Sequence, residues 1–334
     1  MNNMRDTVPT LYIVVPCYNE EEVLPETISR LSDVLSRLVE KRMVHADSAM
    51  LLVDDGSHDN TWMVIEEHFR PNPYVKGLKL ARNAGHQHAL FAGLMYAKEY
   101  ADIVISIDAD LQDDVDVIED MVSKYREGYE VVYGVRNNRM TDTFFKRFTA
   151  QTFYGLMEKM GANIVYNHAD YRLLSKRALN QLSLYQEQNL FLRGIIPMIG
   201  LRSTEVSYDR AKRFAGKSKY SLKKMLSFAF DGITSLSVTP IRYITGAGLI
   251  MSIVSLLVGG YSLISHILGH VVTGWTSLIV SIWLIGGIQL ISLGLIGEYI
   301  GKIYQESKRR PTYHIEAVLQ AKQGLHGNLR ESGG

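Results

Sequence analysis

The stretch IVISIDADLQ, at residues 103–112, gives the clearest indication of the fold. Its first five residues are mostly branched and apolar and predict a short buried strand, and polar residues follow at once. Asp108 and Asp110 are therefore expected on an exposed loop directly after a strand. Carboxylates two positions apart in such a loop suit a hard divalent cation such as Mg²⁺ or Mn²⁺. An Asp-x-Asp pair is also common in turns and caps, so the prediction depends on its position after the strand.

Short apolar runs alternate with amphipathic segments on both sides of this stretch. The runs are rich in Val, Ile and Leu and predict strands at Leu11–Val15, Met50–Val53, Val75–Leu80, Ile103–Ile107 and Val131–Tyr133. The segments between them predict helices, the first because apolar residues recur at spacings of three and four between Leu24 and Leu38. This alternation predicts a Rossmann-like, doubly wound α/β domain whose ligands gather beyond the carboxyl ends of parallel strands.

Two more polar groups lie at predicted strand ends. PCYNE occupies residues 16–20, and DDGS occupies residues 54–57. Gly56 allows a tight turn, and the acids can accept hydrogen bonds from a base N–H or from ribose hydroxyls. Capping explains Asn19, which with Glu22 resembles a capping box, but it does not explain acids at three neighbouring strand ends. The single cysteine, Cys17, adjoins the first strand and is expected to be a buried structural residue.

The region from residue 243 to residue 297 contains no Lys, Arg, Asp or Glu. It divides into Tyr243–Ile267 and Trp275–Gly297, each long enough to cross a hydrocarbon core of about 30 Å as a helix. Basic residues flank the pair but are absent from its connector, so both chain ends are predicted to be cytoplasmic. The polar start of the sequence does not resemble a secretory signal. We therefore expect a multi-pass protein of the cytoplasmic membrane.

A basic stretch precedes the apolar region. Residues 202–224 contain eight Lys or Arg residues and two acids, although the net charge of the chain is only +1. Because the stretch adjoins the predicted spans, anionic lipid or phosphate is favoured over nucleic acid as its partner. The pattern from Tyr220 onward predicts a helix at the membrane interface, with an ordinary surface helix as the alternative. The predicted parts are a cytoplasmic α/β domain (1–215), juxtamembrane amphipathic helices (216–240), a two-helix transmembrane region (241–300) and a cytoplasmic tail (301–334).

The three strand-end motifs, in this order and spacing, resemble those of the family 2 glycosyltransferases, which have a nucleotide-binding GT-A fold. Other segments resemble the polyprenyl-phosphate branch of that family, which includes dolichyl-phosphate mannose synthases and bacterial GtrB-type enzymes. These segments are RNAG at 82–85, HADYR at 168–172, GKSKY at 216–220 and GEYIGKIY at 297–304. The resemblance extends from about residue 10 to about residue 315.

The resemblance implies a role for each matching residue. The base and ribose of a nucleotide sugar would be bound by Pro16, Tyr18, Glu20, Asp54, Asp108 and Ala109. The donor diphosphate and the metal would be bound by Asp108, Asp110 and Gln112, with Asp110 as the direct metal ligand. Asp170 matches the acid proposed as the catalytic base of the family. A phosphate monoester has a second pKa of roughly 6 and is already largely deprotonated at neutral pH, so positioning by Asp170, or a purely structural role, are the alternatives.

Basic side chains supply candidates for binding phosphate, because fixed guanidinium and ammonium donors suit its oxygens. The candidates for the lipid phosphate or the donor diphosphate are Arg136, Arg139, Arg210, Arg213, Lys217 and Lys219. The sequence leaves open which cluster binds which phosphate. Each of these residues could also be a solvated surface charge.

The resemblance implies an inverting transfer of a sugar from a UDP-sugar to undecaprenyl or another polyprenyl phosphate, with Mg²⁺ or Mn²⁺ as cofactor. The product would serve the modification of a cell-surface glycan. Glucose is the first expectation and N-acetylglucosamine the alternative. A processive polysaccharide synthase is a rival, although the Gln-x-x-Arg-Trp segment typical of such enzymes is absent from the sequence. A non-catalytic lipid carrier or flippase subunit is the rival of another class, and related enzymes suggest a homo-oligomer.

Overall fold

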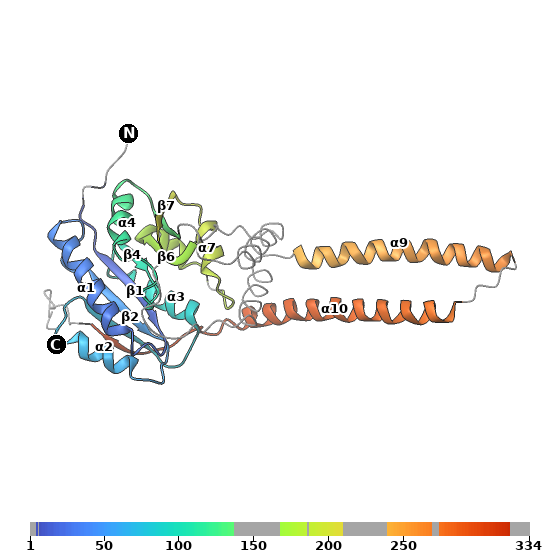
Figure 1. Cartoon of the computed structure of the whole chain (residues 1–334), viewed down its shortest axis with the longest axis horizontal. Helices are drawn as coiled ribbons and strands as arrows, with labels where there is room; N and C mark the ends of the chain where they lie inside the picture. The colour runs from blue at the N-terminus through green and yellow to red at the C-terminus, as the bar shows by residue number, and fades with distance from the viewer. Residues whose placement is uncertain are drawn as a thin grey trace, which may run out of the picture.

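The computed structural model describes residue 5 and residues 7–136, 168–185, 187–209, 239–268 and 274–320. Figure 1 shows an α/β domain from which two long helices extend. The strands are β1 (Leu11–Cys17), β2 (Ala49–Asp54), β3 (Val75–Leu80), β4 (Ile103–Ser106), β5 (Val131–Arg136), β6 (His168–Ser175), β7 (Ser203–Tyr208) and β8 (Ile315–Leu319). The helices are α1 (Leu24–Glu40), α2 (Thr61–Phe69), α3 (His86–Ala97), α4 (Val117–Arg126), α6 (Lys176–Leu182), α7 (Leu192–Met198), α9 (Thr239–Ile267) and α10 (Trp275–Lys308).

These strands form one sheet in the order β7-β5-β6-β4-β1-β2-β3-β8. The predicted parallel core is confirmed, because β1 pairs in parallel with β2 and β4, and β2 pairs in parallel with β3. The sheet as a whole is mixed, since β6 is antiparallel to β4 and β5, and β8 is antiparallel to β3. β6 begins at the end of the sheet where β5 finishes, with His168 opposite Val135, as expected for antiparallel neighbours.

Helices bury both faces of the sheet. Successive side chains of a strand point to opposite faces, so Leu11, Ile13 and Val15 of β1 pack on one side and Tyr12 and Val14 on the other. The first side is covered by α1 and α4, with a contribution from α2, and the second by α3, α6 and α7. The predicted apolar stripe of α1 is confirmed, because its residues at spacings of three and four are buried. Burial on both faces explains why β1 and β2 are almost wholly apolar.

α3 lies unusually close to the centre of the sheet. A Cβ atom at Gly93 would be 2.5 Å from Val14 Cγ1 and 2.7 Å from Val53 Cγ2, so only glycine fits between the helix and strands β1 and β2. The helix begins at His86, directly after Gly85, whose φ is +91°. This packing brings the first residues of α3 to the carboxyl edge of the parallel strands.

α9 and α10 contact one another and project away from the α/β domain (Figure 1). Among the described residues, one stretch, the 25 residues Leu284–Lys308, has the length and composition of a membrane-crossing helix, and Ile241–Met251 is a shorter apolar segment. The presence of a second span therefore stays a prediction. Nearly all of the predicted juxtamembrane region lies outside the described residues. The segment predicted as a tail, 301–334, contributes β8 to the sheet.

Candidate active site

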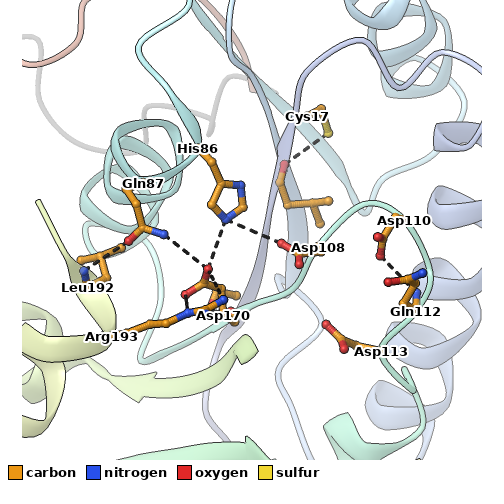
Figure 2. Close-up of polar contacts among 12 residues, drawn as sticks. Cys17, His86, Gln87, Asp108, Asp110, Gln112, Asp113, Asp170, Leu192 and Arg193 are labelled. Carbon is orange, nitrogen blue, oxygen red and sulfur yellow. Dashed lines mark hydrogen bonds and ion pairs between the residues drawn. The ribbon is translucent and has the colours of Figure 1, made fainter. Parts of the chain in front are cut away.

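The carboxyl ends of β1, β2 and β4 meet at one edge of the sheet. Cys17 pairs with Asp54 across β1 and β2, and Val14 pairs with Ser106 across β1 and β4. The three predicted motifs follow these strands and therefore lie side by side. Figure 2 shows the carboxylates of Asp108 and Asp170 at this edge, each in contact with His86 between them.

The turns after β1 and β2 are tied to each other by hydrogen bonds. The backbone N–H of Asn19 donates to Ser57 Oγ at 3.0 Å, and the Asn19 side chain accepts from the N–H of His58 at 2.9 Å. The backbone N–H of Glu20 donates to Thr61 Oγ1 at 2.9 Å. The expected capping box at Asn19 is therefore wrong: α1 begins at Leu24 without a side-chain cap, because Asn19 serves the neighbouring turn.

Asp54, the last residue of β2, is fully buried next to these two turns, which together we call the corner around Asp54. Its Oδ1 accepts a hydrogen bond from the N–H of Ser57 at 3.1 Å, whereas its Oδ2 has no partner among the described residues. Burial raises the pKa of Asp54, against its hydrogen bonds with Ser57. A buried carboxylate oxygen without a partner is costly, so Asp54 is suited to accept a hydrogen bond from a bound ligand.

The other predicted nucleotide contacts surround this corner. Pro16 is buried within β1 opposite Val53, and Tyr18 follows it with its ring edge-on to His58 at 6.3 Å between centroids. Asp55, next to Asp54, accepts hydrogen bonds from the N–H groups of Ala84 at 2.7 Å and Gly85 at 3.0 Å. Asp55 therefore fixes the segment that leads into α3.

The loop after β4 alternates a buried residue with polar ones. Ala109 is buried and its carbonyl accepts a hydrogen bond from Thr27 Oγ1 at 2.8 Å, which fixes the loop to α1. The side chain of Asp110 accepts from the N–H of Gln112 at 3.2 Å, and Leu111 between them has a φ of +54°. Burial raises the pKa of Asp108 to about 6, although the charge of His86 opposes this shift.

The donor set of this loop fits a divalent cation that also uses substrate oxygens. Within the described part of the chain, no three His, Cys, Asp or Glu side chains are grouped closely enough to hold a metal by themselves. Mg²⁺ is usually held by one or two carboxylates together with phosphate oxygens and water. Asp110 and Asp108, with the amide oxygen of Gln112, match that pattern.

Asp170 is the centre of a highly connected polar group at this edge, which we call the Asp170 cluster. β6 places Asp170 beside the end of β4, where Ser106 Oγ donates to the Asp170 carbonyl at 2.6 Å. Four other side chains contact its carboxylate, and its own side chain is only 5% exposed. The cluster comprises Asp170 with Arg172 of β6 and, as Figure 2 shows, His86 and Gln87 of α3 and Arg193 of α7.

The contacts saturate both oxygens of Asp170. Arg193 donates from Nε to Oδ1 and from Nη2 to Oδ2, both at 3.2 Å, and the buried Arg172 donates to Oδ1. Gln87 Nε2 donates to Oδ2 at 3.3 Å, and His86 Nε2 lies 3.4 Å from it. Burial alone would raise the pKa of Asp170, but the charges of Arg193 and Arg172, with His86, hold it well below its usual range.

His86 joins the Asp170 cluster to the loop after β4. Its Nε2 lies 3.7 Å from Asp108 Oδ1 as well as near Asp170. Burial opposes protonation, but contact with Asp170 and the charge of Asp108 outweigh it and raise the pKa of His86 to about 9. A protonated imidazole between two carboxylates reduces their mutual repulsion.

Sequence reasoning found Asp170 but missed three of its partners, His86, Gln87 and Arg193. His86 and Gln87 directly follow the RNAG segment at 82–85, so the position after that segment was a usable signal. Arg193 is one basic residue in the otherwise apolar helix LRGIIPM. A lone cation in a buried helix is expected to have a buried acidic partner, and this was the signal available for it.

Of the predicted phosphate-binding residues, the structure describes Arg136. Its Nη2 donates to Asp113 Oδ1 at 2.9 Å, and Tyr208 also donates to that oxygen, at 2.5 Å. Arg136 is thus already paired with an acid that is almost completely buried. The remaining candidates lie outside the described residues: Arg139, Arg210, Arg213, Lys217 and Lys219.

Comparison with known proteins gives consistent matches. A family model described as glycosyl transferase family 2 matches residues 12–183. The uncharacterized glycosyltransferase YkoT of Bacillus subtilis (strain 168) is 57% identical over 320 residues, which cover 96% of this chain and 95% of that protein. The bactoprenol glucosyl transferase of Shigella phage SfV is 40% identical over 313 residues, covering 92% of this chain and 98% of that protein.

Solved structures match at lower similarity. Mannosyl-3-phosphoglycerate synthase from Rubrobacter xylanophilus has a TM-score of 0.47 at 16% identity, covering 72% of this chain and 75% of that one. The span matched by the family model runs from β1 to just beyond α6. It includes the corner around Asp54, the loop after β4 and all members of the Asp170 cluster except Arg193.

Proposed function

This chain belongs to glycosyltransferase family 2, and from that premise we propose that it transfers glucose from UDP-glucose to the phosphate of a polyprenyl lipid. The choice of sugar and acceptor is supported by relatives of about 40% identity named bactoprenol glucosyl transferases. These relatives align over more than nine-tenths of the chain. The similarity thus includes both the α/β domain and the apolar helices.

One observation carries the proposal: three acidic groups from separate segments meet at one edge of the sheet. Asp54 offers a buried oxygen to an N–H donor of the nucleotide base. Asp108 and Asp110 lie where a diphosphate and its cation would follow the nucleoside. The Asp170 cluster brings the cations of Arg193 and His86 to the same edge of the sheet. This order of groups matches the order of base, diphosphate and anomeric carbon in a UDP-sugar, with the Asp170 cluster on the side from which the acceptor phosphate would attack.

The divalent cation, Mg²⁺ or Mn²⁺, would be held by Asp110, with Asp108 and Gln112 beside it. When bound it would neutralise negative charge that develops on the departing UDP. Asp110 is suited to this role because it is partly exposed on a loop that the hydrogen bond between Thr27 and Ala109 holds to α1. The protein thus presents a fixed carboxylate at the loop surface.

In the proposed reaction an acceptor phosphate oxygen bonds to the anomeric carbon as the bond from that carbon to UDP breaks, inverting the configuration. The acceptor has a second pKa of roughly 6, so at neutral pH it attacks largely as a dianion and needs no base. Asp170 is ionised and already accepts hydrogen bonds on both oxygens, and we assign it to positioning. Its partners Arg193 and His86 would reduce the repulsion between the acceptor and the site's carboxylates.

The membrane topology is part of the same proposal. A polyprenyl chain stays in the bilayer, whereas UDP-glucose is dissolved in the cytosol, so the site must be held at the boundary between them. We assign α9 and α10 to a hairpin that crosses the cytoplasmic membrane, with the α/β domain and both chain ends on the cytoplasmic side. The exposed apolar residues of these helices, such as Leu257 and Leu290, would face lipid or a second copy in a homo-oligomer.

The test is transfer of labelled sugar by the purified full-length protein. Wild type, Asp110→Ala and the surface control Asp47→Ala are incubated with undecaprenyl phosphate, Mg²⁺ or Mn²⁺, and radiolabelled UDP-glucose or UDP-N-acetylglucosamine. We expect label from UDP-glucose in the organic phase, abolished by chelator and lowered at least about a hundredfold in Asp110→Ala, the scale of losing a group that stabilises developing charge. Asp47→Ala, whose acid is exposed, should behave as wild type.

Each result has a defined meaning. Label from UDP-N-acetylglucosamine alone would replace glucose as the sugar while leaving the reaction intact. Transfer that persists with chelator and in Asp110→Ala would contradict the metal assignment. A folded wild-type protein that labels no lipid with either donor would contradict the proposed function and favour a non-catalytic role.

A further inference from the structure

The end of α10 is hydrogen bonded to the loop at residues 187–191, which precedes α7. Glu306 Oε1 accepts from the backbone N–H of Gln188 at 2.7 Å and from that of Asn189 at 3.1 Å. The side chain of Gln188 donates in turn to the carbonyl of Arg310, just beyond the helix. The last turn of α10 is therefore bound to a loop of the α/β domain.

Electrostatics within α10 do not explain a glutamate at this position. The carboxyl end of a helix carries partial negative charge, so an acid in the last turn is unfavourable. Two charge-assisted hydrogen bonds to Gln188 and Asn189 more than offset that cost. The same loop leads into α7, whose N-cap, Phe191, provides no side-chain hydrogen bond. Glu306 thus adds two hydrogen bonds from α10 to the segment that leads into α7.

The anchored loop leads directly to the Asp170 cluster. The first residue of α7, Leu192, donates its backbone N–H to Gln87 Oε1 at 3.2 Å, and the second, Arg193, forms the two-pronged contact with Asp170. Gln87 also donates to Asp170, so the start of α7 is connected to Asp170 in two ways, directly through Arg193 and indirectly through Gln87 (Figure 2). A shift of the loop would therefore move Arg193 relative to Asp170.

The chain beyond α10 contacts β3, the strand that leads to α3 and so to His86 and Gln87 of the Asp170 cluster. Figure 1 shows it running back along the α/β domain, where β8 pairs with β3. The pairing extends to Ala81, whose N–H donates to the His314 carbonyl at 2.9 Å. β3 continues into the segment that opens α3 with His86. The C-terminal segment thus contacts both stretches that bring partners to Asp170.

The length of α10 is consistent with this arrangement. Its 34 residues span about 51 Å at 1.5 Å per residue, roughly 20 Å more than a hydrocarbon core. Its last turns can therefore extend beyond the bilayer and reach the α/β domain while the rest of the helix is in lipid.

We propose that Glu306 is a positioning residue that fixes the loop at 187–191 and so holds Arg193 on Asp170. Its kinetic consequence rests on the proposed function, but its structural consequence does not. Arg193 lies on the Asp170 side of the site, away from Asp110 and Gln112 (Figure 2). Loss of Glu306 should therefore weaken use of the lipid phosphate more than binding of the nucleotide sugar.

The experiment compares full-length wild type, Glu306→Ala, Glu306→Gln and the control Glu316→Gln in lipid nanodiscs. Glu316→Gln removes an exposed ion pair of the same C-terminal segment without touching the loop. Amide hydrogen exchange of residues 187–193 is the structural measurement, and KM for undecaprenyl phosphate and for UDP-glucose is the kinetic one. Glutamine keeps an acceptor oxygen without the charge, so it should rescue part of the effect.

We expect Glu306→Ala to speed exchange in residues 187–193 and raise KM for undecaprenyl phosphate, each roughly tenfold, as for loss of one to two hydrogen bonds to a charged group. KM for UDP-glucose should change less than twofold, Glu306→Gln should be intermediate, and the control unchanged. Unaltered exchange in Glu306→Ala, or equal effects on both KM values, would overturn the proposal. If the wild type transferred no sugar but Glu306→Ala still exchanged faster, the proposed function would fail while the anchoring role would stand.

Discussion

Asp170 contributes to the stability of the fold as well as to the site. The direction of its pKa shift determines the pH range over which this contribution is present. Its partner Arg172 is 1% exposed, and removing one member of a buried ion pair costs roughly 3–5 kcal/mol. The pKa of folded Asp170 lies well below its unfolded value of about 3.9, so the contribution is present above about pH 4 and is lost as the pH falls below it. Asp170→Asn should therefore lower the thermal midpoint by several degrees from pH 5 to 8.

The pH series provides the check on this prediction. The difference in midpoint between wild type and Asp170→Asn should shrink as the pH falls below about 4, because Asp170 is then protonated in the unfolded state but still ionised in the folded state. Tryptophan fluorescence of the full-length protein follows the transition, and Asp47→Asn serves as the control for an exposed acid. A difference that grew toward low pH would show that the carboxylate is not held ionised by its partners.

The positioning role of Asp170 can be separated from that of a general base by a double-mutant cycle with Arg193. The two side chains share two hydrogen bonds, so each single change removes the same interaction. We expect Asp170→Asn and Arg193→Gln each to raise KM for undecaprenyl phosphate, and the double variant to be less impaired than the product of the two, with a coupling of about 1–3 kcal/mol. Independent effects, with Asp170→Asn lowering kcat alone, would favour a base.

Among the elements, α3 has the strictest packing requirement, because it positions His86 and Gln87. The methyl group of Gly93→Ala would overlap Val14 and Val53, and such overpacking costs typically about 1–3 kcal/mol. We expect a lower thermal midpoint and reduced transfer, since α3 must move away from β1 and β2 and carry His86 with it. Gly246→Ala, where the added methyl meets no atom of the described residues within 4 Å, is the matched control. An unchanged midpoint in Gly93→Ala would contradict this packing.

The sequence predicted the elements whose signal is local. β1 to β5 and the helices between them have apolar runs or periodic stripes, because each is buried along its own length. β8 was missed because its residues are mostly exposed, and its partner β3 lies more than 200 positions earlier in the chain. The acids at strand ends were found for the same local reason, whereas Arg193 reaches Asp170 only through the packing of α7 on the sheet.

Over the whole molecule, the chain leaves the α/β domain for α9 and α10 and returns to it as β8. An even number of membrane crossings is required if both of these parts are in the cytosol. α9 has 29 residues and α10 has 34, so each is long enough to cross a core that needs about 20. The return of β8 to the sheet therefore means that if either helix crosses the membrane, both must, and this argument is independent of hydropathy.

Cysteine labelling can test this topology cleanly, because the sequence contains one cysteine, Cys17, and it is buried. Gly274→Cys places a thiol between the two helices, and Ser307→Cys places one at the exposed carboxyl end of α10. In intact cells a membrane-impermeant maleimide should label Gly274→Cys, and should label Ser307→Cys only after permeabilisation. Labelling of both positions from the same side would mean that α9 and α10 do not cross the membrane as a pair, and that the domain meets its lipid acceptor without a transmembrane hairpin.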